Sequence, residues 1–210
     1  LLCNYTDVYN NNFISSEMKF LQATATEAEI EKFTLKQGDV LITKDSESWD
    51  DIAVPAYVES NMSGILCGYH LAQIRSIDID GKFLFWAFSS VNINYQYKIA
   101  ANGITRYGLG KYSLENSLIV VPPLPEQHAI ANFLDRKTAQ IDTLITKKQR
   151  QIELLQEYRT ALINQAVTKG LNPDAPMKDS GIEWLGEVPA HWNLKRIKHL
   201  LKRTKNAVKT

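Results

Sequence analysis

The sequence predicts an α+β protein, in which a globular mixed α/β unit over residues 1–121 precedes a long coiled-coil-type helix over 126–169. Three observations lead to this fold class. The 210 residues are 44% hydrophobic and 10% aromatic, which is enough apolar material for a packed core. Short apolar runs between turn-forming residues fill the first 121 positions, as in a mixed α/β unit. Residues 126–168 contain neither Gly nor Pro, which favours one uninterrupted helix.

The elements of residues 1–121 follow from apolar runs and from the residues that bound them. Apolar runs flanked by turn signals predict strands, and Pro55 within one such run suggests a sheet edge or a bulge. Asp80 is a typical N-cap residue for the helix that follows it. The predicted strands are 39–44, 52–58, 65–74 and 117–121, and the predicted helices are 27–33 and 82–91.

A proline-rich boundary over 122–125 separates this unit from the long helix. Pro125 suits the first helical position, where the backbone amide has no intrahelical partner, and Glu126 suits the positive end of the helix dipole. Gly170 is placed as a helix C-terminal cap. We therefore expect a helix of about 65 Å, at about 1.5 Å per residue.

One seam of this helix steps by three or four residues, which is the coiled-coil pattern. A lone helix would leave the seam in water, so it needs a partner helix from the full-length protein or from another chain. The alternative is a long core helix of one domain. The seam comprises Leu134, Thr138, Ile141, Ile145, Lys148, Ile152, Leu155, Arg159, Leu162 and Ala166.

The C-terminal residues differ from the rest in charge. Residues 170–181 are expected to form a linker, and 182–210 the start of a second globular unit. Residues 195–210 hold seven basic side chains and no acidic one, whereas residues 1–125 hold 9 basic and 14 acidic side chains. A block of one charge sign often serves interaction, sometimes with nucleic acid, although a solvated terminal helix fits equally well.

The sequence lacks the motifs that catalysis would need. Gly110 and Lys111 are followed by Tyr112, so no phosphate-binding loop is formed, and no methyl-transfer or dinucleotide motif occurs. The four histidines and two cysteines do not have the spacing of a metal site. We expect a non-catalytic chain with no metal or cofactor of its own. No apolar run could span a membrane, and the cysteine usage suggests a reducing cytoplasm.

Two loops carry side chains that nucleic-acid recognition uses, at 43–50 and 102–112. The net charge of −5 over residues 1–125 argues against non-specific DNA binding driven by counterion release. It favours the reading of bases by a few placed cations. Ordinary surface loops are the alternative. The candidate DNA-binding residues are Lys44, Ser46, Trp49, Tyr95, Lys98, Thr105, Arg106, Tyr107 and Lys111.

Several of these stretches together resemble the specificity subunit of type I restriction-modification systems. The run Pro-Pro-Leu-Pro-Glu-Gln at 122–127 and the run Ala-Val-Thr-Lys-Gly-Leu at 166–171 bound the helix as in that family. Residues 103–107 resemble the end of a target-recognition domain, and residues 179–186 and 189–192 resemble the opening of the second one. The resemblance covers nearly the whole chain and is most specific over 103–192.

The resemblance implies a piece of a longer specificity subunit that reads one half of a bipartite site in double-stranded DNA. Paired long helices would separate two recognition domains and dock methyltransferase and restriction subunits in a prokaryotic cytoplasm. S-adenosylmethionine, ATP and Mg would belong to those partner subunits, which would supply adenine methylation and ATP-dependent cleavage. Two copies could also self-associate. The helix-pairing residues would be Leu134, Ile141, Ile145, Lys148, Ile152, Leu155, Arg159 and Leu162.

Two other functions are compatible with the sequence. A coiled-coil interaction protein, or a truncated remnant without independent DNA recognition, would keep the helix but not the reading function. An enzyme is the third possibility, and its catalytic parts would lie outside these 210 residues.

Overall fold

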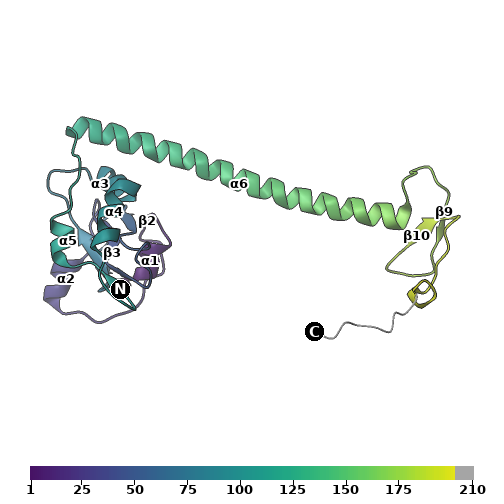
Figure 1. Cartoon of the computed structure of the whole chain (residues 1–210), viewed down its shortest axis with the longest axis horizontal. Coiled ribbons are helices and arrows are strands. Elements are labelled where there is room, and N and C mark those ends of the chain that lie inside the picture. Colours follow the sequence, from purple (N-terminus) through teal and green to yellow (C-terminus); the bar gives the residue numbers. More distant parts are fainter. Residues whose placement is uncertain (202–210) are drawn as a thin grey trace. The chain divides into compact units, whose positions relative to one another are not determined.

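The computed structural model describes residues 1–201 (Figure 1). The end of the predicted second globular unit, 202–210, and most of the basic residues in 195–210 lie outside the described residues. The chain divides into two compact units, Leu1–Gln140 and a second that begins at Ile141. Helix α6 (Leu124–Lys169) contributes to both. Within residues 1–201 no helix is apolar enough over a sufficient length to cross a membrane.

A four-stranded sheet forms the centre of the first unit. Its order is β2 (Phe13–Ile14), β5 (Pro55–Val58), β3 (Val40–Thr43) and β7 (Leu71–Ile74). β2 runs parallel to β5, and the other neighbours are antiparallel. Two short pairs flank the sheet: β1 (Leu2–Cys3) with β6 (Leu66–Cys67), and β4 (Asp45–Ser46) with β8 (Tyr107–Gly108).

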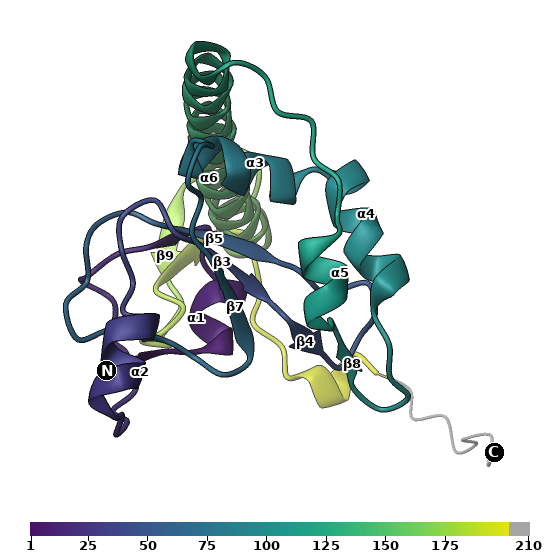
Figure 2. The same ribbon diagram turned by 90° about the vertical axis from the view of Figure 1, so that its left-hand side faces the viewer.

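Both faces of the sheet are covered, which explains why its central strand is apolar at almost every position. Along β3, Leu41 joins one apolar cluster, and Val40 and Ile42 join another on the opposite face. The first cluster includes Val8 of α1 (Tyr5–Tyr9). The second includes Phe85 of α3 (Gly81–Ser89), together with residues of α4 (Val91–Ala100) and α5 (Lys111–Glu115). Figure 2 shows α1 on one side of the strands, and α4 and α5 on the other.

The predicted helices are confirmed, and their caps explain their ends. Helix α2 (Glu27–Phe33) has a capping box between Thr26 and Glu29. The side chain of Asp80 accepts the amide of Phe83 at 2.8 Å, as expected of the N-cap of α3. Ser90 has extended backbone and ends α3 at Ser89, before position 91. Ser90 also caps α4, a helix that the sequence pattern did not predict.

The predicted strands are only partly correct. The 39–44 strand is confirmed as β3, and the 52–58 strand shortens to β5, which begins at Pro55. The 65–74 strand is divided into β6 and β7 by a turn in which the Leu71 amide donates to the Gly68 carbonyl at 3.0 Å. The 117–121 strand is wrong: the Gln96 side chain hydrogen-bonds both the amide and the carbonyl of Leu118, in the place of a neighbouring strand.

Helix α6 ends where it was predicted to end and begins two residues earlier than predicted. It begins at Leu124, so Pro125 is the second helical residue and not the first. The missing N–H of Pro125 still costs no hydrogen bond, because the amides of the first turn have no intrahelical partner. The helix ends at Lys169, and Gly170 has the left-handed φ of +78° expected of a C-terminal cap.

In the second unit, a hairpin follows the end of α6. β9 (Met177–Asp179) pairs antiparallel with β10 (Glu187–Pro189), so the residues predicted as a linker contain a strand. The Trp192 ring lies against Gly170, 3.3 Å from where a β-carbon would stand, and the Trp192 carbonyl accepts the Lys178 ammonium at 2.6 Å. Trp192 therefore packs at the helix end, whereas Trp184 is 84% exposed.

Candidate nucleic-acid interface

The β4–β8 ribbon joins the two loops that the sequence predicted as DNA-binding. Asp45 pairs with Gly108 and Ser46 with Tyr107. The Leu109 amide also donates to the Lys44 carbonyl at 2.7 Å. Residues 43–50 and 102–112 are far apart in sequence, and this ribbon brings them into one surface.

A cluster of polar and aromatic side chains forms at this ribbon, and we call it the Asp45 cluster. Its members are Lys44, Asp45, Tyr69, His70 and Arg106. One oxygen of Asp45 accepts the Arg106 Nη2 at 2.7 Å, and the other lies 2.9 Å from the His70 Nδ1. The His70 ring meets the Tyr69 ring edge-on at 5.3 Å, and the Lys44 Nζ lies 4.2 Å from the Tyr69 ring centre.

The cluster orients Arg106 without using all of its donors. The Asp45 side chain is 16% exposed and the Arg106 side chain 54%. Within the described residues, the hydrogen bonds of Arg106 use Nη2 only. Because a guanidinium has five N–H donors, Nε and Nη1 can still bind a phosphate or a guanine edge. Asp45 therefore holds the Arg106 guanidinium at the surface with donors to spare.

Gly103 allows the tight loop that carries Arg106. The Asn102 and Gly108 backbones hydrogen-bond each other in both directions, which closes the loop. Gly103 has a φ of +154°, and a β-carbon there would lie 1.9 Å from the Arg106 carbonyl oxygen. Only glycine fits this close approach. The loop leaves Ile104 95% exposed, with Thr105 beside it in solvent.

The nine candidate residues fall into separate places. Lys44, Thr105 and Arg106 lie at the Asp45 cluster and its loop. Ser46 is buried, and its hydroxyl accepts the Ser48 amide at 3.3 Å, so it supports the ribbon from inside. Tyr107 is half-buried in β8.

The remaining candidates lie outside the ribbon. Trp49 is half exposed on the loop after β4. The pKa of neighbouring Asp50 is lowered, mainly by the Ser48 hydroxyl and its own backbone, with a smaller contribution from the Lys98 charge. Asn94 of α4 donates to the Ile52 and Ala53 carbonyls at 3.3 and 3.0 Å, which places the helix that carries Tyr95 and Lys98 next to the segment that follows the Trp49 loop. Lys111 starts α5 and forms an exposed ion pair with Glu115 at 3.4 Å.

Sequence reasoning missed Asp45, Tyr69 and His70 as members of the site. Asp45 stood inside a predicted loop, but its role depends on the distant Arg106. Tyr69 and His70 follow Gly68 in the turn between β6 and β7, and treating 65–74 as one strand concealed that turn. The glycine was the one local signal that could have revealed it.

The first turns of α6 are attached to the first unit. The Asp135 carboxylate accepts the Lys82 Nζ at 2.6 Å and the Trp86 Nε1 at 2.9 Å. Gln127 is buried, accepting the Asp80 amide and donating to the Pro122 carbonyl, both at 2.8 Å. Ala131 is buried on the same helix stripe.

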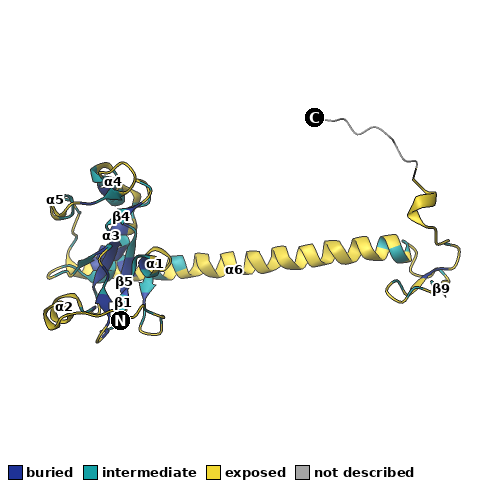
Figure 3. Ribbon diagram, turned by 90° about the horizontal axis from the view of Figure 1, so that it is seen from below, coloured by how far each residue is buried: buried dark blue, intermediate teal, exposed yellow. Residues whose placement is uncertain are grey.

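The predicted helix-pairing seam therefore divides into two parts. Leu134 and Thr138 are half-buried beside this attachment, within the first unit. From Ile141 to Leu162 the seam is exposed, and Figure 3 shows this length of α6 almost wholly in the colour of exposed residues. The exposed part comprises Ile141, Ile145, Lys148, Ile152, Leu155, Arg159 and Leu162.

The described residues contain no cluster of three or more His, Cys, Asp or Glu side chains that could hold a metal ion. Burial raises the pKa of the Cys67 thiol to about 12 and raises that of Cys3 as well. Both cysteines are free and lie opposite each other in the β1–β6 pair. Thiols held in the protonated form are poor nucleophiles and poor metal ligands.

Comparison with known proteins identifies the family. The model of the type I restriction modification DNA specificity domain matches residues 3–154. The protein described as the type I restriction enzyme MjaX specificity subunit of Methanocaldococcus jannaschii is 29% identical over 171 residues, 79% of this chain and 38% of that protein. The MjaVIII specificity subunit of the same organism is 26% identical over 185 residues, 87% of this chain and 39% of that protein.

A solved structure on the assembly and conformational transition of the type I R-M system contains a chain with the same fold. Its TM-score is 0.53 at 20% identity, over 66% of this chain and 33% of that one. The chain spans about two fifths of the length of the two curated relatives. Because the family model matches well over half of its residues, the chain belongs to the family of type I restriction-modification DNA specificity domains.

Proposed function

We propose that this chain is a DNA-reading part of a type I specificity subunit, and that its first unit reads one half of a bipartite site in double-stranded DNA. The observation that carries the proposal is the Asp45 cluster, in which a carboxylate holds Arg106 at the surface with donors to spare. Membership of the DNA specificity domain family supports the same function.

The charge distribution favours selective over indiscriminate binding. Residues 1–125 carry a net charge of −5, so phosphate attraction alone gives weak affinity. Lys44 and Arg106 are cations held beside aromatic or acidic partners, which limits the conformational freedom that binding must remove. In this proposal Arg106 contacts a base edge or a phosphate directly, while Ser46 and Tyr107 keep the ribbon in shape.

The exposed part of α6 serves as a spacer and a docking surface. The 29 residues from Ile141 to Lys169 lie beyond the first unit. They span about 43 Å at about 1.5 Å per residue, or about 13 base-pair steps of about 3.4 Å. This length is shorter than that of the whole helix, because the first turns are attached to the recognition unit.

The chain in this proposal is non-catalytic and works in a prokaryotic cytoplasm. Methyltransferase subunits dock on the exposed helix and carry S-adenosylmethionine for adenine methylation. Restriction subunits join them and use ATP and Mg for cleavage. The exposed seam supports such docking, since an apolar stripe of this length requires a protein partner.

The test of DNA reading begins with selection of a duplex from a random library by the chain, alone or with its methyltransferase partner. We expect Arg106→Ala to weaken binding to the selected duplex by about 10- to 100-fold, the range of one bidentate base contact. Binding to unrelated duplexes should change little. Lys36→Ala removes an exposed cation outside the cluster and is the matched control. An equal loss on all duplexes would reassign Arg106 to a phosphate contact, and an unaltered affinity would exclude it from the interface.

A further inference from the structure

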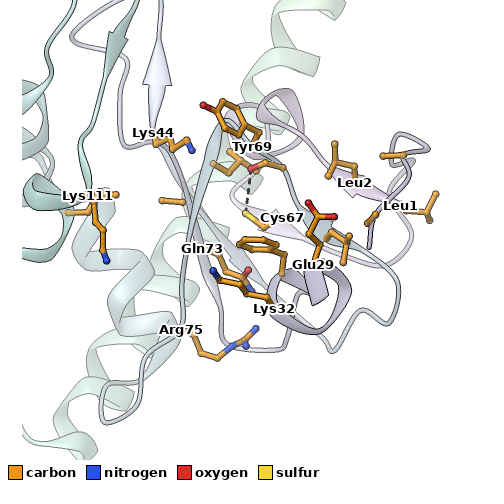
Figure 4. Close-up of a pocket in the computed structure, with 18 of the residues that line it drawn as sticks. Leu1, Leu2, Glu29, Lys32, Lys44, Cys67, Tyr69, Gln73, Arg75 and Lys111 are labelled. Atoms are coloured by element: carbon orange, nitrogen blue, oxygen red, sulfur yellow. Dashed lines mark hydrogen bonds between the residues drawn. The ribbon is translucent and has the colours of Figure 1, made fainter. Parts of the chain in front are cut away.

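An open cleft runs along β7, which lies at one edge of the four-stranded sheet, and the proposed DNA-reading function does not explain it. Its volume is about 740 Å³, and twenty residues line it. Helix α2 contributes Glu29 and Lys32 to one side, and α5 contributes Lys111 to the other, as Figure 4 shows. Gln73 of β7 and Arg75, which follows it, lie between them.

The backbone of β7 offers unused hydrogen-bonding groups to this cleft. The Lys44 amide donates to the His70 carbonyl at 3.1 Å, and in the β3–β7 register Ile42 stands opposite Ala72. Because hydrogen-bonded pairs alternate in an antiparallel ladder, the peptide groups of residues 70, 72 and 74 face β3. The Thr43 amide agrees with this pattern, since it donates away from β7 to the Val54 carbonyl at 3.1 Å.

The alternate peptide groups of the strand face outward. The Leu71 amide is used by the Gly68 carbonyl, which leaves the Leu71 carbonyl, both groups of Gln73 and the Arg75 amide at the edge. In the described part of the chain no strand pairs with this edge. Such a row of donors and acceptors is a template for another extended chain.

The lining of the cleft suits the side chains of an added strand. Leu71 belongs to the apolar cluster on one face of the sheet, and Cys67 packs against it. Leu109 belongs to the cluster on the other face, where Ala72 and Leu114 also pack. Side chains of a strand alternate between the two faces, so an added strand would meet apolar surface on both.

The charge of the cleft is opposite to that of the unit around it. Lys32, Lys44, Arg75 and Lys111 line it, which is four of the nine basic residues in 1–125. Glu29 is the one acidic residue of the lining, and it is already bound to Thr26 in the capping box. Arg75 is paired with buried Asp39 at 2.7 Å, so the three lysines supply the net positive charge.

We infer that the β7 edge binds an extended segment of a partner protein, with both apolar and acidic side chains on each face, as a fifth strand of the sheet. The open peptide groups and the apolar lining on both faces favour a polypeptide over a nucleic-acid strand, and the lysines select acidic side chains. The cleft shares Lys44 and Tyr69 with the Asp45 cluster, so a strand bound here lies beside the proposed DNA-reading surface.

The test uses the capped heptapeptide Val-Val-Glu-Glu-Val-Val-Glu, which carries valine and glutamate on both faces of a strand. It is added to the whole chain and followed by amide NMR. We expect the Gln73 and Arg75 amides to shift and to gain at least tenfold protection from hydrogen exchange. The same peptide with lysine in place of glutamate should bind at least tenfold more weakly. A peptide N-methylated at the residues whose amides face β7 should also bind at least tenfold more weakly, because those amides can no longer donate hydrogen bonds to the strand edge.

Charge-reversal variants locate the binding on the chain. The double variant Lys32→Glu and Lys111→Glu should bind the peptide at least tenfold more weakly than the parent chain. The matched control is the double variant Lys19→Glu and Lys36→Glu, at two exposed lysines outside the lining. It should change the affinity for the peptide less than twofold. Unaltered Gln73 and Arg75 amides at millimolar peptide would overturn the inference, as would equal binding of the N-methylated peptide.

A duplex measured in the same assay separates this inference from the proposed function. Peptide binding without any duplex binding would leave the inference standing and overturn DNA reading by this chain. Duplex binding that is lost in the Lys32 and Lys111 double variant, with no peptide binding, would assign the cleft to DNA and overturn the inference.

Discussion

At the scale of single residues, the candidate interface depends on a few side chains whose partners are far away in sequence. Asp45 binds Arg106 across 61 positions and His70 across 25. Such exposed ion pairs contribute about 0–1 kcal/mol to stability, so their main effect is to orient side chains. We therefore expect stability and recognition to respond differently to substitutions in the Asp45 cluster.

Gly103 is the residue whose replacement should damage the interface most. Gly103→Ala would place a β-carbon against the Arg106 carbonyl at a φ of +154°. We expect a loss of about 1–3 kcal/mol in the free energy of unfolding, the usual cost of such backbone strain, together with loss of specific DNA binding. Urea unfolding and duplex titration measure the two effects. Gly110→Ala is the control, since nothing lies within 4 Å of its β-carbon, and it should be nearly neutral.

The two cysteines should be unreactive in the folded protein. Burial raises the pKa of Cys67 to about 12 because it disfavours the thiolate. At pH 8 this leaves about one Cys67 thiolate in ten thousand. We expect no reaction with a disulfide reagent over minutes at pH 8, and two reactive thiols per chain in denaturant. Rapid labelling of the native protein would contradict the burial of these thiols.

At the scale of elements, α6 has an attached part and an exposed part along its length. Its first turns are held to α3 by Asp135 and Gln127, and the rest is exposed from Ile141. A coiled-coil pattern can be recognised along a whole helix, but it does not tell which part is already covered. The attachment of Leu134 and Thr138 to the first unit is a result of tertiary packing.

Asp135 should stabilise the attachment in a pH-dependent way. Its hydrogen bond raises the pKa of Lys82 above the ordinary lysine value. A raised lysine pKa stabilises the fold at every pH below about 10.5, and this stabilisation is lost as the pH rises through the folded-state value. We expect Asp135→Asn to lower the free energy of unfolding by about 1 kcal/mol at pH 7, because both side chains are partly exposed.

Urea unfolding of this variant from pH 6 to pH 11 tests that expectation. The difference from the parent protein should be constant up to pH 9 and shrink above about pH 10.5. Glu153→Gln breaks the exposed Arg150–Glu153 pair on the same helix and should lower the free energy of unfolding by less than Asp135→Asn does. A difference that shrinks already between pH 6 and pH 8 would show that Lys82 is not the partner that matters.

At the scale of the whole molecule, the exposed seam is an apolar stripe that a second helix could cover. Ile152 is 48% and Leu155 58% exposed, and apolar residues continue in this way up to Val167. Such a stripe is stable in water when it is paired. Pairing with a second copy would supply two identical half-site readers, and pairing with another helix of a longer subunit would supply two different ones.

Ile152→Asp should abolish self-association without unfolding the first unit, because this residue lies beyond Gln140. Sedimentation at tens of micromolar should give twice the chain mass of 23.8 kDa for the parent and the single mass for the variant. Gln149→Asp is the control at an exposed position off the seam. A single mass for the parent would exclude pairing between copies, and loss of the first unit's melting transition in the variant would show that the two units are coupled.

Local sequence patterns were sufficient to predict the elements whose ends and conformation depend on neighbouring residues. Helix α2, the Asp80 cap, β3, the start of α6 within the proline run and the Gly170 cap depend on neighbouring residues. The resemblance carried by residues 103–192 also identified the family, because its motifs are contiguous stretches of chain.

Only the tertiary structure decided what depends on distant residues. The expected 117–121 strand became an irregular segment because the Gln96 side chain occupies its backbone groups. The 65–74 run became two strands, and their turn supplies Tyr69 and His70 to the Asp45 cluster. The open edge of β7 is equally invisible in sequence, since an edge exists only by reference to the order of strands in the sheet. The sequence by itself therefore determined the family and the elements with local signals, whereas packing decided which side chains share a surface, because that depends on contacts between residues dozens of positions apart.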